Sequence, residues 1–405
     1  MQRSTDRILT THVGSLVRPP ALLDFILRQI AGLPYDQAAF EATLRQSVKE
    51  VVARQAEVGI DVPSDGEFSK SNFLFYVSER LSGLEQIPAE QRRTIGTYYA
   101  GLISEFPGFM EQYNGMYRSM WLAKELDRDL VDAALKAPFP ATRVVDKIGY
   151  RGQAELARDL ANFKEALAGH AFADAFVPSA TPSRNDADPG HIYASEEAYL
   201  YDLADAMHVE YQAIVDAGYV VQLDLGLPAR NQSLPGVRNP TAEQLRRASE
   251  LQVEAYNHAL RGIPPEKVRY HLCWGSMNTP HTMDIPLKEF IDIILKINAG
   301  AYSIEAANPR HEHEWKVWQE VVLPEDKILI PGVISHSTNV VEHPELIADR
   351  IRKFASAVGR ERVIASTDCG FSQGWDMQRM HVEVQWAKLA SLAEGARLAS
   401  ADLWS

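Results

Sequence analysis

Apolar runs of four to eight residues recur along the 405-residue chain, and most are separated by longer stretches with helical periodicity. The runs that we interpret as strands cover residues 8–15, 60–67, 175–178, 219–224, 267–273, 302–308, 328–333 and 363–368. Helices are expected from residue 20 onward and over 36–57, 153–168, 197–216 and 377–392. Eight short strands that alternate with helices predict an α/β protein, a closed parallel (β/α)8 or TIM barrel, in preference to an open sheet.

The alternation breaks down between residues 84 and 150, after the second predicted strand. This stretch contains a Met- and aromatic-rich segment, 106–121, and a short strand-like run at 143–145. We therefore expect one barrel over residues 1–405, with a helical and irregular insertion at 84–150 between the second and third strands. Residues 106–121 are expected to serve simple packing. A lid over the pocket, or a surface between the subunits of a homo-oligomer, is the functional alternative.

Composition places the chain among ordinary globular enzymes, with 46% hydrophobic and 23% charged residues. The formal net charge of −13 at pH 7 argues against nucleic acid or an anionic membrane as a partner. Two cysteines are not a disulfide framework, and the N-terminus lacks the apolar core of a signal peptide, so we expect a cytoplasmic location. No apolar run approaches the ~18 residues that a membrane span needs.

Four side chains of metal-binding type lie at the ends of predicted strands. His271 and Cys273 are two residues apart, so on a strand they point to the same side. Cys369 follows the last strand, and Glu305 places one carboxylate in an otherwise apolar run. Two thiols, an imidazole and a carboxylate form a suitable tetrahedral zinc set. The structural alternative is that both cysteines are inert core thiols and that Glu305 pairs with a nearby cation.

The order of these motifs resembles the zinc-bearing barrel of cobalamin-independent methionine synthase, and related single-barrel enzymes such as epoxyalkane:coenzyme M transferase look similar. The resemblance runs from Thr10 to about Phe371. It implies a Zn²⁺ cofactor with the ligands His271, Cys273, Glu305 and Cys369. Zinc with two thiolates and a carboxylate carries net negative charge, which suits it to holding an arriving thiol as a nucleophilic thiolate.

The resemblance also implies a substrate pocket at other strand ends. Ser15 matches the family's Gly-Ser and Glu67 its Gly-Glu, which bind the amino-acid portion of the thiol substrate. Asp224 matches the Asp of the family's Gln-x-Asp, which contacts the substrate amino group. Leu225-Gly226 replaces the acidic continuation that the family usually shows, and this weakens the expectation that the substrate is homocysteine. Ordinary turn chemistry is the alternative reading of Ser15 and Glu67.

His336 matches a family histidine that assists proton movement at the methyl donor, so we assign it as the catalytic residue. The family's preceding Asp is Ser335 here, and no carboxylate next to it in sequence orients the ring. A loop histidine bonded to the backbone is the structural alternative. Two further histidines, His311 and His313, are assigned to the opening of a solvated helix after Pro309.

Two departures from the family concern the alkyl donor. The Trp that stacks on the folate pterin is missing from residues 177–182, and at this length we expect no second barrel. The resemblance implies zinc-dependent transfer of an alkyl group, with methyl as the first candidate, to a small-molecule thiol. The two departures argue against methyltetrahydrofolate as the donor. Thiol addition to an epoxide at the same site is the nearest alternative. A metal-free barrel like uroporphyrinogen decarboxylase, which would rely on Arg and Asp, and a non-enzymatic binding barrel are the others.

Overall fold

The computed structural model of this protein describes residues 1–73, 75–87, 97–116, 122, 124–137, 141–183, 192–228, 234, 237 and 240–405. For residues 97–100, 114–116 and 141 it describes the backbone only. None of the helices in these ranges is both long and apolar enough to cross a lipid bilayer.

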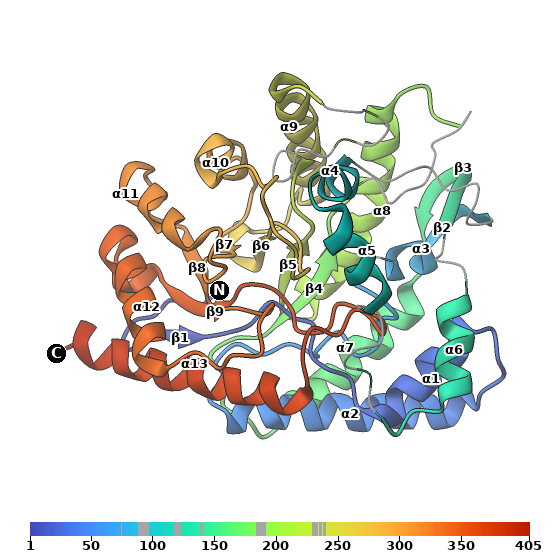
Figure 1. The fold of residues 1–405 in the computed structure, drawn as a ribbon, viewed down its shortest axis with the longest axis horizontal. Coiled ribbons are helices and arrows are strands. Elements are labelled where there is room, and N and C mark those ends of the chain that lie inside the picture. Colours follow the sequence, from blue (N-terminus) through green and yellow to red (C-terminus); the bar gives the residue numbers. More distant parts are fainter. Residues whose placement is uncertain are drawn as a thin grey trace.

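Seven parallel strands form a curved central sheet, in the order β1-β9-β8-β7-β6-β5-β4 (Figure 1). They are β1 (Leu9–Thr10), β4 (Phe176–Ala180), β5 (Val220–Asp224), β6 (Val268–Leu272), β7 (Ala301–Ile304), β8 (Ile328–Ile334) and β9 (Ile364–Thr367). Every residue of these strands is buried, which is typical of a parallel sheet that helices cover. This burial explains why the strands are nearly continuous apolar runs.

Residues 60–63 join the two edges of the sheet. The backbone amide of Val62 donates to the carbonyl of Thr10 at 3.0 Å, beside β1. On the other side, the amide of Phe176 in β4 donates to the carbonyl of Pro63 at 3.0 Å. The seven strands and residues 60–63 therefore form one cylinder, and the predicted (β/α)8 barrel is confirmed, although the second predicted strand, 60–67, is only an isolated bridge at Val62.

Amphipathic helices surround the cylinder (Figure 1). They are α1 (Pro20–Ile30), α2 (Gln37–Glu57), α7 (Gln153–Leu167), α8 (Glu196–Asp216), α9 (Ala242–Ala259), α10 (Ile291–Ile294), α11 (Val317–Glu320), α12 (Pro344–Val358) and α13 (Val382–Leu403). Local sequence sets their starts: Asp36 caps α2 through the amides of Ala38 and Ala39, and Thr241 forms a capping box with Gln244 at α9. The predicted helix at 377–392 is wrong in its limits, because His381 caps α13 and the helix begins at Val382.

Residues 81–150 build a separate element beside the barrel. Strands β2 (Leu81–Ile87) and β3 (Ala141–Tyr150) pair antiparallel with each other. Helix α3 (Tyr76–Arg80) precedes this pair, and α4 (Thr97–Glu105), α5 (Pro107–Met116) and α6 (Arg128–Lys136) connect its strands. The strand-like run at 143–145 lies in β3, while 117–121 of the aromatic segment lie outside the described residues. The interpretation of 84–150 as an insertion within a single domain stays a prediction.

A buried polar cluster fixes β2–β3 to the barrel. Glu210 on α8 accepts hydrogen bonds from the hydroxyls of Tyr76, at 2.8 Å, and Tyr150, at 2.6 Å. Arg80 forms ion pairs with Glu210 at 3.3 Å and with Asp159 on α7 at 2.5 Å. Because all of these groups except the partly buried Tyr150 are buried, and because they are mutually satisfied, the cluster holds the β2–β3 pair against α7 and α8.

Candidate active site

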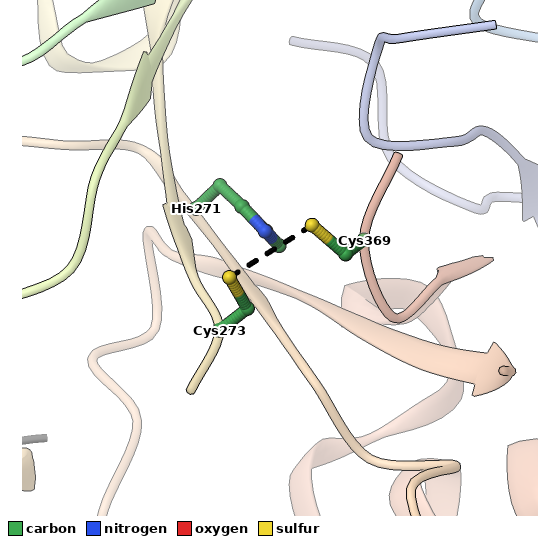
Figure 2. A group of neighbouring side chains, drawn as sticks. All are labelled: His271, Cys273 and Cys369. Atoms are coloured by element: carbon green, nitrogen blue, oxygen red, sulfur yellow. Dashed lines mark hydrogen bonds between the residues drawn. The ribbon is translucent and has the colours of Figure 1, made fainter. Parts of the chain in front are cut away.

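Strands β6 and β9 bring three of the four predicted metal ligands together at their carboxyl ends. His271 lies in β6, Cys273 follows this strand, and Cys369 follows β9. The two Sγ atoms are 3.8 Å apart, and the ligand atoms of all three residues lie within 4.8 Å of one another. Figure 2 shows the imidazole of His271 beside the line that joins the two sulfur atoms. The carboxyl ends of barrel strands are where such enzymes place their chemistry.

The chemistry of these three side chains fits a zinc ion. Nε2 of His271 is buried and has no hydrogen-bond partner among the described residues, while Nδ1 lies 3.2 Å from the hydroxyl of Ser303. A metal-bound histidine usually has one ring nitrogen hydrogen-bonded to a neighbouring group, which leaves the other nitrogen for the metal. The contact with Cys273, together with burial, raises the pKa of Cys369 well above its usual range. A divalent cation would reverse this effect by stabilising both thiolates.

Glu305 lies in a neighbouring group of side chains. Its two carboxylate oxygens accept hydrogen bonds from the amide of Trp274, at 2.9 Å, and from Nδ2 of Asn308, at 2.8 Å. Ligand atoms of Glu305, His336 and Asp368 lie within 4.8 Å of one another. The structure therefore places Glu305 directly beside the residue that follows Cys273, but outside the group of His271 and the two thiols. Its assignment as the fourth ligand stays a prediction.

His336 follows β8 and is buried, and neither ring nitrogen has a hydrogen-bond partner among the residues that the structure describes. Burial lowers the pKa of His336 to about 4, so the ring is neutral at neutral pH. The carboxylates of Glu305 and Asp368 lie beside it, in place of the missing preceding Asp. Sequence reasoning missed Asp368 as a functional residue, although it stands directly before Cys369 at the end of a strand.

Asp368 is buried, and its Oδ1 accepts hydrogen bonds from the amides of Ala306 and Ala307, both at 2.7 Å. Oδ2 has no hydrogen-bond partner among the described residues. Burial and the nearby charge of Glu305 raise the pKa of Asp368 well above its usual range. A carboxyl group with a raised pKa binds its proton more tightly, and in its protonated form it can donate a hydrogen bond to a neighbouring group.

The three predicted substrate-binding residues lie in the same cavity as three of the four predicted metal ligands. A cavity of about 70 Å³ is lined by Ser15, Glu67 and Asp224 together with His271, Cys273 and Cys369. Side chains at the ends of the first, second and fourth predicted strands thus meet side chains at the ends of the fifth and eighth predicted strands, which are β6 and β9. The cavity has the composition expected of a site that binds a small thiol beside a metal.

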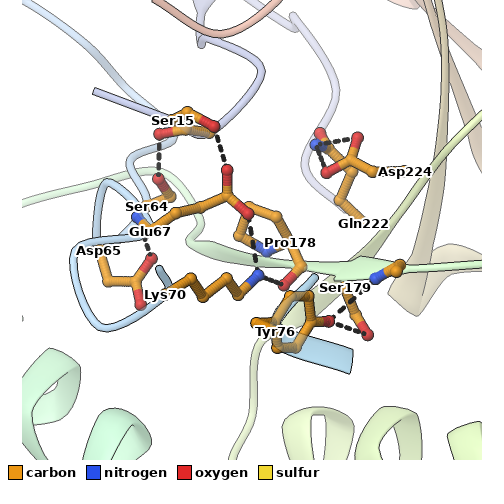
Figure 3. Close-up of polar contacts among 12 residues, drawn as sticks. Ser15, Ser64, Asp65, Glu67, Lys70, Tyr76, Pro178, Ser179, Gln222 and Asp224 are labelled. Carbon is orange, nitrogen blue, oxygen red and sulfur yellow. Dashed lines mark hydrogen bonds and ion pairs between the residues drawn. The ribbon is translucent and has the colours of Figure 1, made fainter. Parts of the chain in front are cut away.

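Glu67 is held as an ionised carboxylate at one side of this cavity. The Ser15 hydroxyl and Nζ of Lys70, the latter at 2.8 Å, both donate hydrogen bonds to it (Figure 3). Burial acts to raise the pKa of Glu67, but Lys70 and Ser15 outweigh burial and lower it below its usual value. The backbone of Glu67 has a φ of 59°, in the left-handed region. Such strain at a non-glycine residue is found more often at functional sites than elsewhere.

Asp224 faces the cavity from the end of β5. Both of its oxygens accept from Nε2 of Gln222, at 2.9 and 3.0 Å (Figure 3). Burial raises the pKa of Asp224 to about 7, against the opposing effect of His271. Leu225, the next residue, has a φ of 112°, so a second strained position borders the cavity. Two carboxyl groups that approach one small cavity favour a ligand with a positively charged group.

Comparison with known proteins identifies the family. The model of the cobalamin-independent synthase catalytic domain matches residues 187–389, which is half of the chain and includes His271, Cys273, Glu305, His336 and Cys369. The chain belongs to this family.

Similar proteins cover nearly the whole chain. A methionine synthase of Saccharolobus solfataricus is 24% identical, with 97% of this chain and 95% of that protein covered. The uncharacterized protein YxjH of Bacillus subtilis is 23% identical, with 97% and 94% covered. The solved structure of a B12-independent methionine synthase from Shewanella sp. W3-18-1, in complex with selenomethionine, matches with a TM-score of 0.68 at 18% identity, with 98% and 99% covered. This last comparison supports the barrel fold independently.

Proposed function

We propose that this protein catalyses the zinc-dependent transfer of an alkyl group to a substrate thiol, with methyl as the first candidate for that group. The observation that carries the proposal is that His271, Cys273 and Cys369 meet in one small cavity with the carboxylates of Glu67 and Asp224. The family and the methionine synthases among its relatives support methyl transfer to sulfur. We place the reaction in the cytoplasm, with a small thiol and a small electrophile as the partners.

Different residues of the cavity are assigned to metal binding and to substrate binding. His271, Cys273 and Cys369 would hold zinc, with Glu305 as the predicted fourth ligand. When bound, zinc would lower the pKa of an arriving thiol and keep it nucleophilic. Glu67, oriented by Lys70 and Ser15, and Asp224, oriented by Gln222, would bind a substrate ammonium group and fix the position of the thiol.

His336 is proposed as the group that moves a proton at the electrophile. In the resting protein burial keeps the ring neutral, so one ring nitrogen presents a lone pair as a proton acceptor and the other carries a proton. Asp368, whose pKa is raised by burial and by Glu305, lies in the same group, and we assign to it the orientation of the ring that Ser335 does not supply. Opening of an epoxide by the same thiol is the second candidate, and this acid–base group beside the cavity is the observation that favours it.

We predict that 5-methyltetrahydrofolate is a poor methyl donor compared with a small sulfonium compound. In β4 and the turn after it, residues 177–182 contain no aromatic side chain that could stack on a pterin, and Ser179 is instead bonded to Glu210 at 2.7 Å. The test follows thioether formation by mass spectrometry, with homocysteine as the thiol and three electrophiles: the folate, the sulfonium compound and a short epoxide.

Faster reaction with zinc-loaded than with zinc-free protein is expected for at least one of the small electrophiles. Equal rates for the zinc-loaded and zinc-free protein would contradict the proposed function. Efficient methylation from micromolar folate would leave the proposed function standing, but would show that the prediction about the donor is wrong.

A further inference from the structure

A second buried group of potential metal ligands lies outside the cavity described above. Nδ1 of His281 and Nε2 of His311 both contact the same oxygen, Oδ2 of Asp284, at 2.6 and 2.9 Å. His281 and Asp284 belong to the loop after β6, and His311 to the loop after β7. All three are buried, which corrects the expectation that His311 opens a solvated helix. The exposed His313 fits that expectation.

The outer nitrogens of the two histidines are fixed by partners that only accept hydrogen bonds. Nε2 of His281 lies 2.9 Å from the carbonyl oxygen of Met277, and Nδ1 of His311 lies 2.9 Å from the carboxylate of Glu314. Glu314 is held in turn by the backbone amide of Leu287 at 2.7 Å. Each outer nitrogen must therefore carry a proton.

The nitrogens that face Asp284, Nδ1 of His281 and Nε2 of His311, then require a positive charge between them and the carboxylate. If both imidazoles were neutral, His281 and His311 would each present a lone pair to the carboxylate oxygen of Asp284, and the three groups would repel. Positive charge must lie among them, as two further protons or as one divalent cation. The total charge is the same in both cases, because one divalent cation replaces two protons.

Two observations favour the cation. The side chain of Asp284 is completely buried, and its second oxygen, Oδ1, has no hydrogen-bond partner among the described residues. A carboxylate that coordinates the ion through both oxygens would account for Oδ1, whereas two imidazolium protons on Oδ2 leave it without a partner. In addition, ring nitrogens bonded outward to a carbonyl and to a carboxylate are the usual outer partners of metal-bound histidines.

We propose that His281, Asp284 and His311 form a second metal site for a divalent first-row transition metal, with zinc as the first candidate. Two imidazoles and one carboxylate suit Zn²⁺ or Fe²⁺, and three protein ligands leave one or more positions open to water. His281 also lines a cavity of about 940 Å³ that shares none of its lining residues with the thiol cavity. With one carboxylate and no thiolate among its ligands, this metal is the stronger Lewis acid of the two.

The second site would lie next to the loop that carries Cys273. Trp274, the following residue, stacks its ring on that of His311, with the centroids 3.7 Å apart and the planes at 16°. His281 has a φ of 56°, so the backbone is strained where it presents this ligand. A metal here would fix the β6 loop, and its presence does not depend on the proposed function of the thiol cavity.

Metal content measured by elemental analysis tests the proposal. After incubation of the full chain with zinc and removal of loosely bound ions, the wild type is expected to keep two zinc ions per chain. His311→Gln and Asp284→Asn should each keep one, and Cys369→Ser should also keep one. His313→Gln is the matched control, because His313 is exposed and two residues away, and it should keep two.

Cobalt substitution assigns each loss to its site. The absorption from sulfur-to-cobalt charge transfer should survive in His311→Gln and weaken in Cys369→Ser. One metal in the wild type that is lost only in Cys369→Ser would overturn the second site and leave the thiol site standing. If only His311→Gln and Asp284→Asn lost metal and Cys369→Ser kept all of it, the second site would stand and the thiol site would be contradicted. If these variants fail to fold, anomalous scattering from wild-type crystals locates the metals directly, and no peak among His281, Asp284 and His311 would overturn the proposal.

Discussion

Replacing Cys369 by Ser should abolish most zinc binding at the thiol cavity while the barrel stays folded. A serine hydroxyl does not deprotonate at neutral pH, so one of the two sulfur ligands is lost without a substitute. Outer partners of metal ligands contribute about 10- to 100-fold to metal affinity or activity, so loss of a direct ligand should cost at least about 100-fold. The fold should persist because a barrel core of this size does not depend on one metal.

The measurement pairs thiol-dependent activity and cobalt–sulfur absorption with circular dichroism as the test of folding. Ser372→Ala is the matched control: Ser372 is buried three residues further along the same loop, and its hydroxyl bonds only weakly, at 3.4 Å, to Gly374. It should behave like the wild type. Near-stoichiometric metal at the thiol cavity in Cys369→Ser would rule out Cys369 as a ligand.

The second large effect is expected for Glu67→Gln, through recognition of the thiol substrate. Gln keeps the shape of the side chain but removes the charge that Lys70 and Ser15 hold in place. A hydrogen bond to a charged group contributes about 2 kcal/mol, so the KM for an amine-bearing thiol should rise about 30-fold. The KM for a thiol without an amino group should change little.

Glu79→Gln on α3 makes the same chemical change outside the cavity, where Glu79 bonds to Ser71 at 2.7 Å. It should leave both KM values unchanged. If Glu67→Gln raised KM equally for thiols with and without an amino group, Glu67 would be a structural residue, and the ammonium-binding role would have to be abandoned.

The barrel was predictable because its strands are short, apolar and separated by helices, and because parallel strands buried on both faces need such runs. The same regularity allowed His271, Cys273 and Cys369 to be placed at one end of the sheet. The two-residue spacing of His271 and Cys273 and the position of Cys369 after β9 were sufficient for this prediction, because the carboxyl ends of all barrel strands lie at one rim.

Other features depend on tertiary contacts that sequence periodicity does not encode. Residues 60–63 form only an isolated bridge at Val62 and are held by a few hydrogen bonds to β1 and β4, and the pairing of β2 with β3 joins segments about 60 residues apart. His311 stands directly before the 3-10 helix Glu312–Lys316, as expected, but its burial could not be predicted because only folding brings Asp284 and Trp274 against it. Glu305 lies on the predicted strand. The distance of its side chain from the thiols depends on the conformation of the loop after β6, and the spacing of residues on the strands does not determine that conformation.

X-ray absorption at the metal edge tests the central claim most directly. The spectrum of the resting enzyme should show two sulfur neighbours at ~2.3 Å, because Cys273 and Cys369 are the only cysteines, with nitrogen and oxygen neighbours at ~2.0–2.2 Å. The measurement is made on His311→Gln protein, so that only the thiol cavity contributes. Adding the acceptor thiol should bring a third sulfur into the shell and release about one proton per site, since the metal binds the thiolate form. A thiol confirmed as substrate by turnover that leaves the count at two sulfurs would contradict the account, because the thiol would then react without being held at the metal.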